Sequence, residues 1–220
     1  MPAKNRIKDY IPNSYYHLYN RGVEKRPIFL DVQDYNVFQS YLETYLSPKD
    51  PNRLSILLEN GNPKEKDTAR KLLRLNNFSD QIKLLAFCLI PNHFHLLIHQ
   101  KEANSIDIFA NSLFTRYTMY FNKKYKRVGP LFQGLYKAVL VQSEEQLLWL
   151  SRYIHRNPLD LLQGRALQSY QYSSYPDYLK IRNKSWVKPE EILSYFKSPY
   201  KNFVESHEPE PESLYPLFLE

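Results

Sequence analysis

Hydrophobic and polar positions near the start of the chain predict one strand followed by one helix. Residues 15–22, YYHLYNRG, alternate and are rich in aromatic side chains, as in a half-buried strand, and they end at a turn-forming Asn-Arg-Gly. Residues 31–46 then carry apolar side chains three to four positions apart, behind Asp31 as a candidate N-cap. The pattern therefore changes from strand to helix early in the chain.

The middle of the chain predicts a hairpin and a second helix. Residues 82–98 contain two short apolar runs, IKLLAFCLI and HFHLLI, with the turn-forming pair Pro91-Asn92 between them. We interpret these runs as two antiparallel strands. Residues 105–124 return to helical spacing and end in basic side chains, which suit the negative end of a helix dipole.

A further strand and a third helix follow. Residues 129–141 begin with a glycine-punctuated stretch and end in a β-prone run, which is typical of a strand entered from a loop. Ser143 is a candidate N-cap, and Gln146 three residues later resembles a capping box. Pro158 should end this helix at or near Asn157, because the residue before a proline disfavours helical backbone angles.

Two regions fit these periods less well. Residues 47–80 are polar and contain several prolines, which predicts an inserted loop with one short amphipathic helix. After about residue 165 the pattern loosens, and the chain ends in the acidic stretch ESHEPEPESLYPLFLE, which we expect to be mobile. We therefore predict a main domain over 1–180, with the insertion at 47–80, and a partly mobile C-terminal extension over 181–220.

The charge balance favours a polyanionic partner. Lys and Arg total 30 against 23 Asp and Glu, which gives a net charge of +7 and a pI near 9.2. A basic surface of this kind suits nucleic acid. The 19 Tyr and 12 Phe add aromatic faces, most of which should fill the core while some can stack on unpaired bases.

Cys88 is the single cysteine, which excludes an internal disulfide framework and a cysteine-based zinc cluster and fits a reducing compartment. We expect a buried, inert thiol, because Cys88 lies in the apolar run LLAFCLI. The start MPAKNRIKDY lacks the apolar core of a signal peptide, and no apolar run approaches the roughly 18 residues of a membrane span. We therefore expect a cytoplasmic protein with no membrane partner.

Two histidines of the predicted hairpin share one face of their strand. Residues two apart point to the same side, so His93 and His95 point together while Phe94 points away. Their separation along the strand is about 6 to 7 Å, which lets both imidazoles reach one cation. Such histidines often only pack or hydrogen-bond. His99 lies on the same nominal face, so a zinc site of three histidines is an alternative.

The third predicted helix places a tyrosine and an amide on one face. Tyr153 and Asn157 are four residues apart and therefore lie one turn above each other. The tyrosine hydroxyl can serve as a nucleophile and the amide oxygen as a metal ligand. On its own, however, Tyr153 also fits an ordinary packing role with its hydroxyl at the surface.

Together these residues resemble a known family. PNHFHLLI is similar to the His-hydrophobe-His signature of single-tyrosine transposases, and RYIHRNP is similar to their catalytic helix. The likeness is strongest to the transposases associated with repetitive extragenic palindromes (REP) and covers roughly residues 13 to 180. Supporting segments are YHLYNRG, PIFLD, RYTMYFNKKYKRVGPLFQGLYKAVLV and YQYSSYPDYL.

The resemblance implies an α+β domain with a ferredoxin-like (RRM-like) antiparallel sheet and helices packed on it, in which the histidine pair occupies a central strand. It also implies that His93, His95 and Asn157 bind Mg²⁺ or Mn²⁺ and that Tyr153 is the nucleophile. A divalent ion on a non-bridging phosphate oxygen withdraws charge, and few protein ligands leave positions open for phosphate and water. The expected activity is cleavage and rejoining of single-stranded DNA near a hairpin through a 5′-phosphotyrosine link, by a monomer or a homodimer.

The sequence departs from the family pattern in two places. Relatives of this type often carry an acidic residue two positions after the tyrosine, where this chain has His155, which should face away from Tyr153. The segment 47–80 is also longer than we expect between the first helix and the hairpin, and it offers basic residues that either contact DNA or only face solvent.

Six basic residues are candidates for contacts with DNA. The densest basic cluster lies at the end of the second predicted helix beside two tyrosines, a combination suited to phosphate and bases. Two more candidates lie near the first and last predicted strands. The six are Lys123, Lys124, Lys126 and Arg127 in the cluster, and Arg21 and Lys137 outside it.

Two other functions remain open from the sequence. One is a non-catalytic regulator that binds hairpin DNA or RNA on the same fold, against which the intact set of candidate site residues argues. The other is a zinc hydrolase that uses His93, His95 and either His99 or His155.

Overall fold

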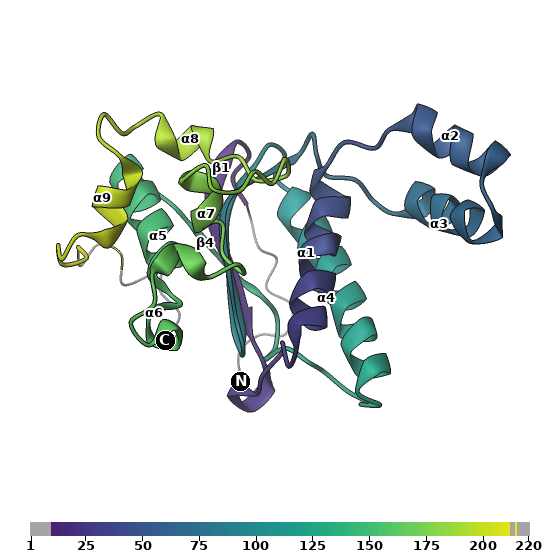
Figure 1. Cartoon of the computed structure of the whole chain (residues 1–220), viewed down its shortest axis with the longest axis horizontal. Coiled ribbons are helices and arrows are strands. Elements are labelled where there is room, and N and C mark those ends of the chain that lie inside the picture. Colours follow the sequence, from purple (N-terminus) through teal and green to yellow (C-terminus); the bar gives the residue numbers. More distant parts are fainter. Residues whose placement is uncertain (1–9, 212–213, 215–220) are drawn as a thin grey trace.

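The computed structural model describes residues 10–211 and 214, and its centre is a four-stranded antiparallel sheet with helices on both faces (Figure 1). The strands β1 (Ser14–Arg21), β2 (Ile82–Ile90), β3 (His93–Gln100) and β4 (Lys137–Leu140) lie in the order β2-β3-β1-β4. A helix follows β1 and another follows β3, which gives the β-α-β-β-α-β order of a ferredoxin-like fold. The predicted α+β class is confirmed.

One face of the sheet is covered by α1 (Val32–Leu46) and α4 (Ser105–Lys124). Asp31 caps α1 as predicted, because its side chain accepts a hydrogen bond from the backbone N–H of Asp34. Phe38, Phe94 and Tyr117 pack together in this core with centroid distances of 5.0 to 5.3 Å between Phe38 and the other two rings. The strand residues that point to this side are therefore unavailable for chemistry.

The opposite face is covered by α5 (Glu144–Arg156) and by the chain that follows it. This segment forms short helices in place of the loose structure that the sequence predicted. They are α6 (Leu159–Leu162), η2 (Leu167–Ser169), α7 (Tyr175–Tyr178), α8 (Glu190–Leu193) and α9 (Tyr200–Glu205). Ile192, Tyr200 and Val204 are buried in the same core as α5, so this part of the predicted extension is packed structure.

The predicted mobility of the acidic end concerns residues that lie in part outside the described structure, namely 212–213 and 215–220. Within the described part, Leu214 is fully buried.

The insertion after α1 differs from the prediction. It forms two helices, α2 (Pro51–Asn60) and α3 (Pro63–Arg74), which run side by side as an arm that projects from the α1 and α4 side (Figure 1). The expectation of a loop with a single short helix was wrong. Each helix starts at a side-chain N-cap followed by proline, and Asn62 with Glu65 forms a complete capping box.

The strand predicted at the β-prone end of residues 129–141 is confirmed as β4. The loop before β4 contacts the turn η1 (Val23–Lys25) and the end of β1 through backbone hydrogen bonds from Val23 to Leu131 and from Gln133 to Arg21. The capping box predicted at the start of α5 is only half formed. At the start of α5, Ser143 accepts from the N–H of Gln146, but the Gln146 side chain accepts from Gln142 and leaves the capping box incomplete. Among the described residues, no helix is both long and apolar enough to cross a membrane.

Candidate active site

Strand pairing assembles a polar row on the α5 side of the sheet. Tyr19 of β1 lies opposite His95 of β3 on one side and opposite Lys137 of β4 on the other. Arg21 lies opposite His93 in the same register. Directly opposed residues of paired strands share a face, so two histidines, a tyrosine and two cations meet near one end of the sheet.

The alternation predicted for the histidine strand is confirmed. Phe94 and Leu96 are fully buried in the α1 and α4 core, while His93 and His95 face α5. The His93 and His95 rings meet edge to face with centroids 4.9 Å apart. His95 is completely buried and His93 is partly exposed, so the site opens at the His93 end.

Helix α5 brings the other two predicted residues to the pair. The Tyr153 ring meets the His95 ring edge to face, with centroids 5.4 Å apart. Asn157, the C-cap of α5, places Oδ1 3.1 Å from Nε2 of His93. Two pairs of side chains from distant parts of the chain therefore converge as predicted.

The polar atoms of this cluster suit a divalent cation. His95 Nε2 is buried and has no hydrogen-bond partner among the described residues, which is costly unless another ligand uses its lone pair. His93 contacts two oxygens, Asn92 Oδ1 at 2.6 Å and Asn157 Oδ1 at 3.1 Å. A neutral imidazole can donate to only one of them, which leaves the other nitrogen with its lone pair facing an oxygen.

The electrostatics of the cluster keep both histidines neutral. Burial lowers the pKa of His95 well below its ordinary value, and the neighbouring His17 and His93 lower it further. Burial also lowers the pKa of His93, while its contact with the Asn157 side chain acts in the opposite direction. Neutral imidazoles are the form that binds metal ions. The carbonyl end of α5 lies nearby, and its partial negative charge favours a cation at this place.

The alternative zinc site is not assembled. His155 directs Nδ1 to Tyr200 Oη and Nε2 to Ser174 Oγ, 2.9 and 2.8 Å away, inside the core. His99 pairs with Asn13 at 3.1 Å. Within residues 10–211 and 214, no group of three or more His, Cys, Asp or Glu side chains is placed to hold a metal ion.

Two arginines that flank the tyrosine anchor α5 from its far side. Arg152 is only 1% exposed and donates to the carbonyls of Phe203, Ser206 and Glu208. Arg156 donates to the carbonyl of Val204 at 2.8 Å. The basic residues of RYIHR therefore hold the helix against the C-terminal segment, and they fix where Tyr153 projects.

His155 faces away from Tyr153, as its offset predicted. Its ring links α9 to the sheet, because it contacts Tyr200 of α9 on one side and Ser174 on the other. Ser174 Oγ in turn accepts from the backbone N–H of Phe87 in β2 at 2.8 Å. Tyr200 Oη also contacts Ser151 Oγ of α5 at 2.9 Å. Burial lowers the pKa of His155 to about 3, so it serves as a neutral structural residue. In this chain the position is used for packing.

Sequence reasoning missed one residue of the cluster, His17. It lies on β1, two residues before Tyr19 on the same face, and its Nε2 is 2.8 Å from Nδ1 of His95. The signal that could have found it is the strand alternation of YYHLYNRG, which points His17, Tyr19 and Arg21 to one side. The pairing with β3 is not visible in the sequence.

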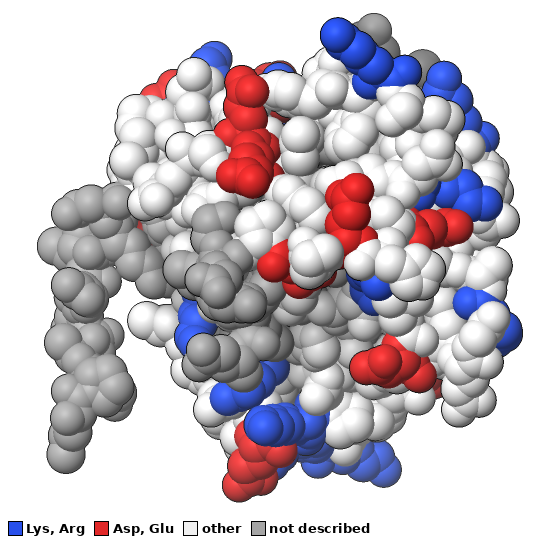
Figure 2. All heavy atoms as spheres, turned by 90° about the vertical axis from the view of Figure 1, so that its left-hand side faces the viewer, with Lys and Arg blue, Asp and Glu red and all other residues white. Residues whose placement is uncertain are grey.

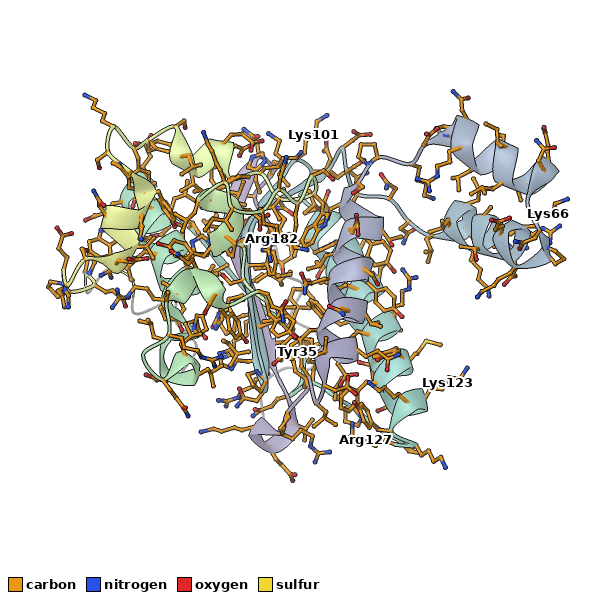
Figure 3. The ribbon with its side chains drawn as sticks, viewed as in Figure 1. Tyr35, Lys66, Lys101, Lys123, Arg127 and Arg182 are labelled. Carbon is orange, nitrogen blue, oxygen red and sulfur yellow. The ribbon has the colours of Figure 1, made fainter. Side chains whose placement is uncertain are left out.

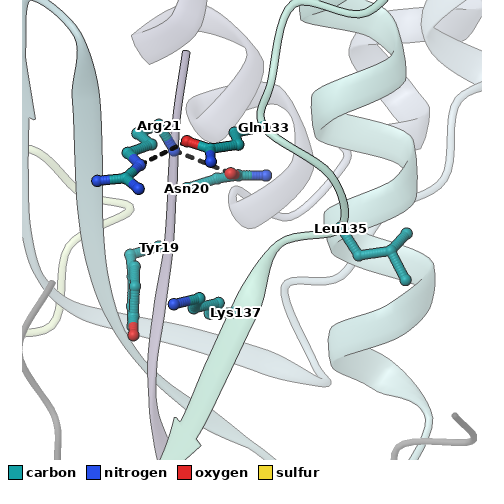
Figure 4. Close-up of a pocket in the computed structure, with 6 residues that line it drawn as sticks. All are labelled: Tyr19, Asn20, Arg21, Gln133, Leu135 and Lys137. Atoms are coloured by element: carbon teal, nitrogen blue, oxygen red, sulfur yellow. Dashed lines mark hydrogen bonds between the residues drawn. The ribbon is translucent and has the colours of Figure 1, made fainter. Parts of the chain in front are cut away.

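Two of the candidate DNA contacts lie beside the cluster. Tyr19, Arg21 and Lys137 line a pocket together with Gln133, which accepts a 2.6 Å hydrogen bond from Arg21 Nε (Figure 4). Lys137 Nζ stands 5.8 Å from the centroid of the Tyr19 ring. A cation and an aromatic face next to the histidines suit a phosphate and a base.

The other four candidates lie on the α1 and α4 side of the sheet. Lys123 is exposed near the lower end of α4 (Figure 3), and Lys126 is exposed just beyond it. Arg127 is half-buried, because its guanidinium lies over the Phe121 ring and donates to Asn122 Oδ1 at 3.3 Å. Lys124 instead pairs with Asp31 and with the buried Asp34, each at 2.8 Å, so much of its charge is neutralised within the protein. The predicted basic cluster is therefore smaller than its sequence suggested.

On the α5 face of the molecule, Lys and Arg side chains gather at the lower end and at the upper right, with acidic side chains between them (Figure 2).

Comparisons with known proteins agree with the resemblance drawn from the sequence. Residues 61–157 match the family model of the IS200-like transposases, a range that contains all four predicted site residues. Among solved structures, a REP-associated tyrosine transposase bound to a REP hairpin is similar to the chain with a TM-score of 0.51 and 10% identity, over 84% of this chain and 96% of that one. At that identity the likeness shows the fold.

A putative transposase from Deinococcus radiodurans R1 is similar at a TM-score of 0.38 and 14% identity, over 69% of this chain and 96% of that one. The comparison with curated proteins found no match.

Proposed function

We propose that this chain, whose residues 61–157 match the IS200-like transposase family, is a transposase that cleaves and rejoins single-stranded DNA through Tyr153. The observation that carries the proposal is the convergence of Tyr153 and Asn157 from α5 on His93 and His95 from β3. The buried Nε2 of His95, next to Tyr153, has no hydrogen-bond partner among the described residues. Such an atom is costly in a site that only packs, and it is explained if the site binds a ligand there.

The proposed reaction is a transfer of one phosphodiester link. Tyr153 Oη forms a bond to the phosphorus and loses its proton, while the bond from phosphorus to the 3′ oxygen breaks and that oxygen gains a proton. The product is a 5′-phosphotyrosine and a free 3′-OH. The energy of the phosphodiester is retained in the protein–DNA bond, so the same site can rejoin the DNA by the reverse step.

His93 and His95 through Nε2 and Asn157 through Oδ1 would hold Mg²⁺ or Mn²⁺. When bound there, such an ion supplies electrophilic assistance at the scissile phosphate. The chain itself supplies orientation, because α5 is anchored by Arg152 and Arg156 and keeps Tyr153 against the His95 ring. Positioning of this kind lowers the barrier by removing the entropy of bringing nucleophile and phosphate together.

The DNA would approach the cluster from the side of Arg21 and Lys137. These cations line the pocket next to His93 and can neutralise backbone phosphates, while the Tyr19 ring offers a stacking surface. The solved relative of similar fold is bound to a REP hairpin. We therefore propose hairpin DNA with adjacent unpaired nucleotides as the substrate.

The test is formation of a covalent complex between the purified protein and labelled single-stranded hairpin DNA in the presence of Mn²⁺. A denaturing gel should show a slower band with the wild type and none with Tyr153→Phe. Tyr195→Phe is the matched control, because Tyr195 is a 42% exposed tyrosine in the C-terminal segment. The control should form the complex at the wild-type level.

A covalent complex that persists in Tyr153→Phe would overturn the assignment of the nucleophile. Tight hairpin binding without any covalent complex, across a diverse pool of oligonucleotides, would instead support a non-catalytic binding protein on this fold.

A further inference from the structure

His17 is a polar side chain that contacts a predicted metal ligand from a neighbouring strand. It is completely buried on β1, and its Nε2 lies 2.8 Å from Nδ1 of His95. The two rings stack with centroids 5.0 Å apart and planes 21° apart. The position is fixed by the sheet, because β1 and β3 pair along their whole length.

This contact restricts where His95 carries its proton. A nitrogen–nitrogen contact of 2.8 Å requires one hydrogen between the two atoms. If His17 donates, the single proton of a neutral His95 sits on Nε2, where it is a buried N–H without an acceptor among the described residues. If His95 donates through Nδ1, its Nε2 carries a lone pair.

Only the second arrangement prepares His95 to bind a cation through Nε2. The first one leaves a buried donor unpaired and also blocks the atom that would bind. The hydrogen bond made by one imidazole nitrogen generally decides the state of the other, and metal-binding histidines commonly donate their second N–H to an acceptor in the protein.

We propose that His17 is a positioning residue that accepts the Nδ1 proton of His95 and thereby directs the lone pair of His95 Nε2 toward the divalent cation. This rests on the proposed function. His17 lies outside residues 61–157, so its role comes from the sheet pairing and not from the family match. An imidazole takes the place that a carboxylate or a carbonyl holds beside many metal-binding histidines.

The first test uses the metal-free protein. Long-range ¹H–¹⁵N spectra of histidine-labelled protein distinguish the two tautomers of a neutral imidazole, and His95 is assigned by comparison with His95→Gln. The expected result is a proton on Nδ1 and a lone pair on Nε2. A proton on Nε2 would overturn the proposal, whatever the protein does to DNA.

The second test measures Mn²⁺ affinity without DNA, by the loss of free-ion signal in electron paramagnetic resonance. His17→Leu removes the acceptor and should weaken binding about 10- to 100-fold, the usual effect of removing such a partner. His17→Gln keeps an acceptor oxygen and should recover much of that affinity. Thermal unfolding of both variants distinguishes removal of the acceptor from failure to fold.

Equal affinity of His17→Leu and wild type would overturn the proposal, as would a His17→Gln variant that stays folded but binds no better than His17→Leu. If His17→Leu does not fold, the tautomer measurement on the wild type decides. The His95 tautomer and the Mn²⁺ affinities of the His17 variants can both agree with the proposal while the protein fails to cleave DNA. That result would support the role of His17 and reject only the proposed function.

Discussion

Asn157 Oδ1 stands 3.1 Å from His93 Nε2, which joins the end of α5 to the start of β3 at the open end of the site. His93 makes a shorter contact, 2.6 Å, from Nδ1 to Asn92 Oδ1, so the single proton of the neutral ring is placed on Nδ1 and is donated to Asn92. The lone pair of Nε2 then faces the lone pairs of Asn157 Oδ1, and a shared cation removes this repulsion.

We therefore expect Asn157 to contribute to metal affinity. Asn157→Leu, which removes the oxygen, should weaken Mn²⁺ binding by about tenfold or more, equivalent to about 1.4 kcal/mol. Asn157→Asp keeps an oxygen and adds a negative charge, so it should bind Mn²⁺ at least as tightly as the wild type. Calorimetric titration of the DNA-free protein measures both.

The control for this series is Asn60→Leu, at the exposed end of the arm helix α2. Wild-type affinity in Asn157→Leu would mean that Asn157 is a packing residue, and weakened binding in Asn60→Leu would show that the assay follows general damage.

The parts of the site that the sequence predicted are those set by local periodicity. Strand alternation placed His93 and His95 on one face, and the spacing of four on α5 placed Tyr153 with Asn157. Both relations hold within a single element. Each relation stays correct even where the predicted first or last residue of the strand or helix is wrong. It can therefore be predicted without knowledge of the rest of the fold.

The parts that were missed depend on contacts between distant segments. His17 reaches His95 only because β1 lies beside β3, and no feature of residues 15–22 reveals that neighbour. The segment after residue 165 has no clear period, yet Tyr200 is buried against α5 and donates to or accepts from two of its side chains. Its short helices are stabilised by that packing and not by their own sequences.

The buried contact between His155 and Tyr200 should contribute measurably to stability. His155→Leu removes hydrogen bonds of 2.9 and 2.8 Å in the core and should lower the free energy of unfolding by about 1–3 kcal/mol. Urea denaturation followed by circular dichroism measures the change. His207→Leu, at an exposed position, should stay within about 0.5 kcal/mol of the wild type.

A double-mutant cycle identifies the contact itself. His155→Leu combined with Tyr200→Phe should cost less than the sum of the two single changes, by about 0.5–3 kcal/mol. Strict additivity would contradict a direct interaction between these two side chains.

The basic residues at the end of α4 should separate into two kinds. Replacing Lys123, Lys126 and Arg127 together by Ala should flatten the salt dependence of hairpin DNA binding, by about one unit of slope for each phosphate that is no longer neutralised. Lys124→Ala should leave that slope nearly unchanged. It should instead lower stability by about 1–3 kcal/mol, because the buried carboxylate of Asp34 loses its ion pair.

Fluorescence anisotropy at several salt concentrations measures the slope. The matched comparison is Arg21→Ala with Lys137→Ala, which removes the two cations beside the histidines. A salt slope that changes for this pair and not for the α4 triple would place the DNA on the α5 side of the sheet alone.

The thiol of Cys88 reports on the opening of the sheet beside the site. Cys88 lies on β2 directly opposite His95, is fully buried, and has its pKa raised well above its ordinary value by burial. Because the thiolate is the reactive form, labelling requires the chain to open. An aromatic disulfide reagent should therefore react with native protein more than about 1000-fold slower than with urea-denatured protein, in line with ordinary folding equilibria.

The variant Ile181→Cys supplies an internal control, because position 181 is 61% exposed. It should show one fast and one slow thiol per chain. Mn²⁺ at saturating concentration should slow the Cys88 reaction further, because a ligand that binds only the folded state lowers the open population by mass action. Fast labelling of Cys88 in the native wild type would contradict the burial, and a rate indifferent to Mn²⁺ in a protein that binds the ion would mean that labelling proceeds through an opening that leaves the metal ligands in place.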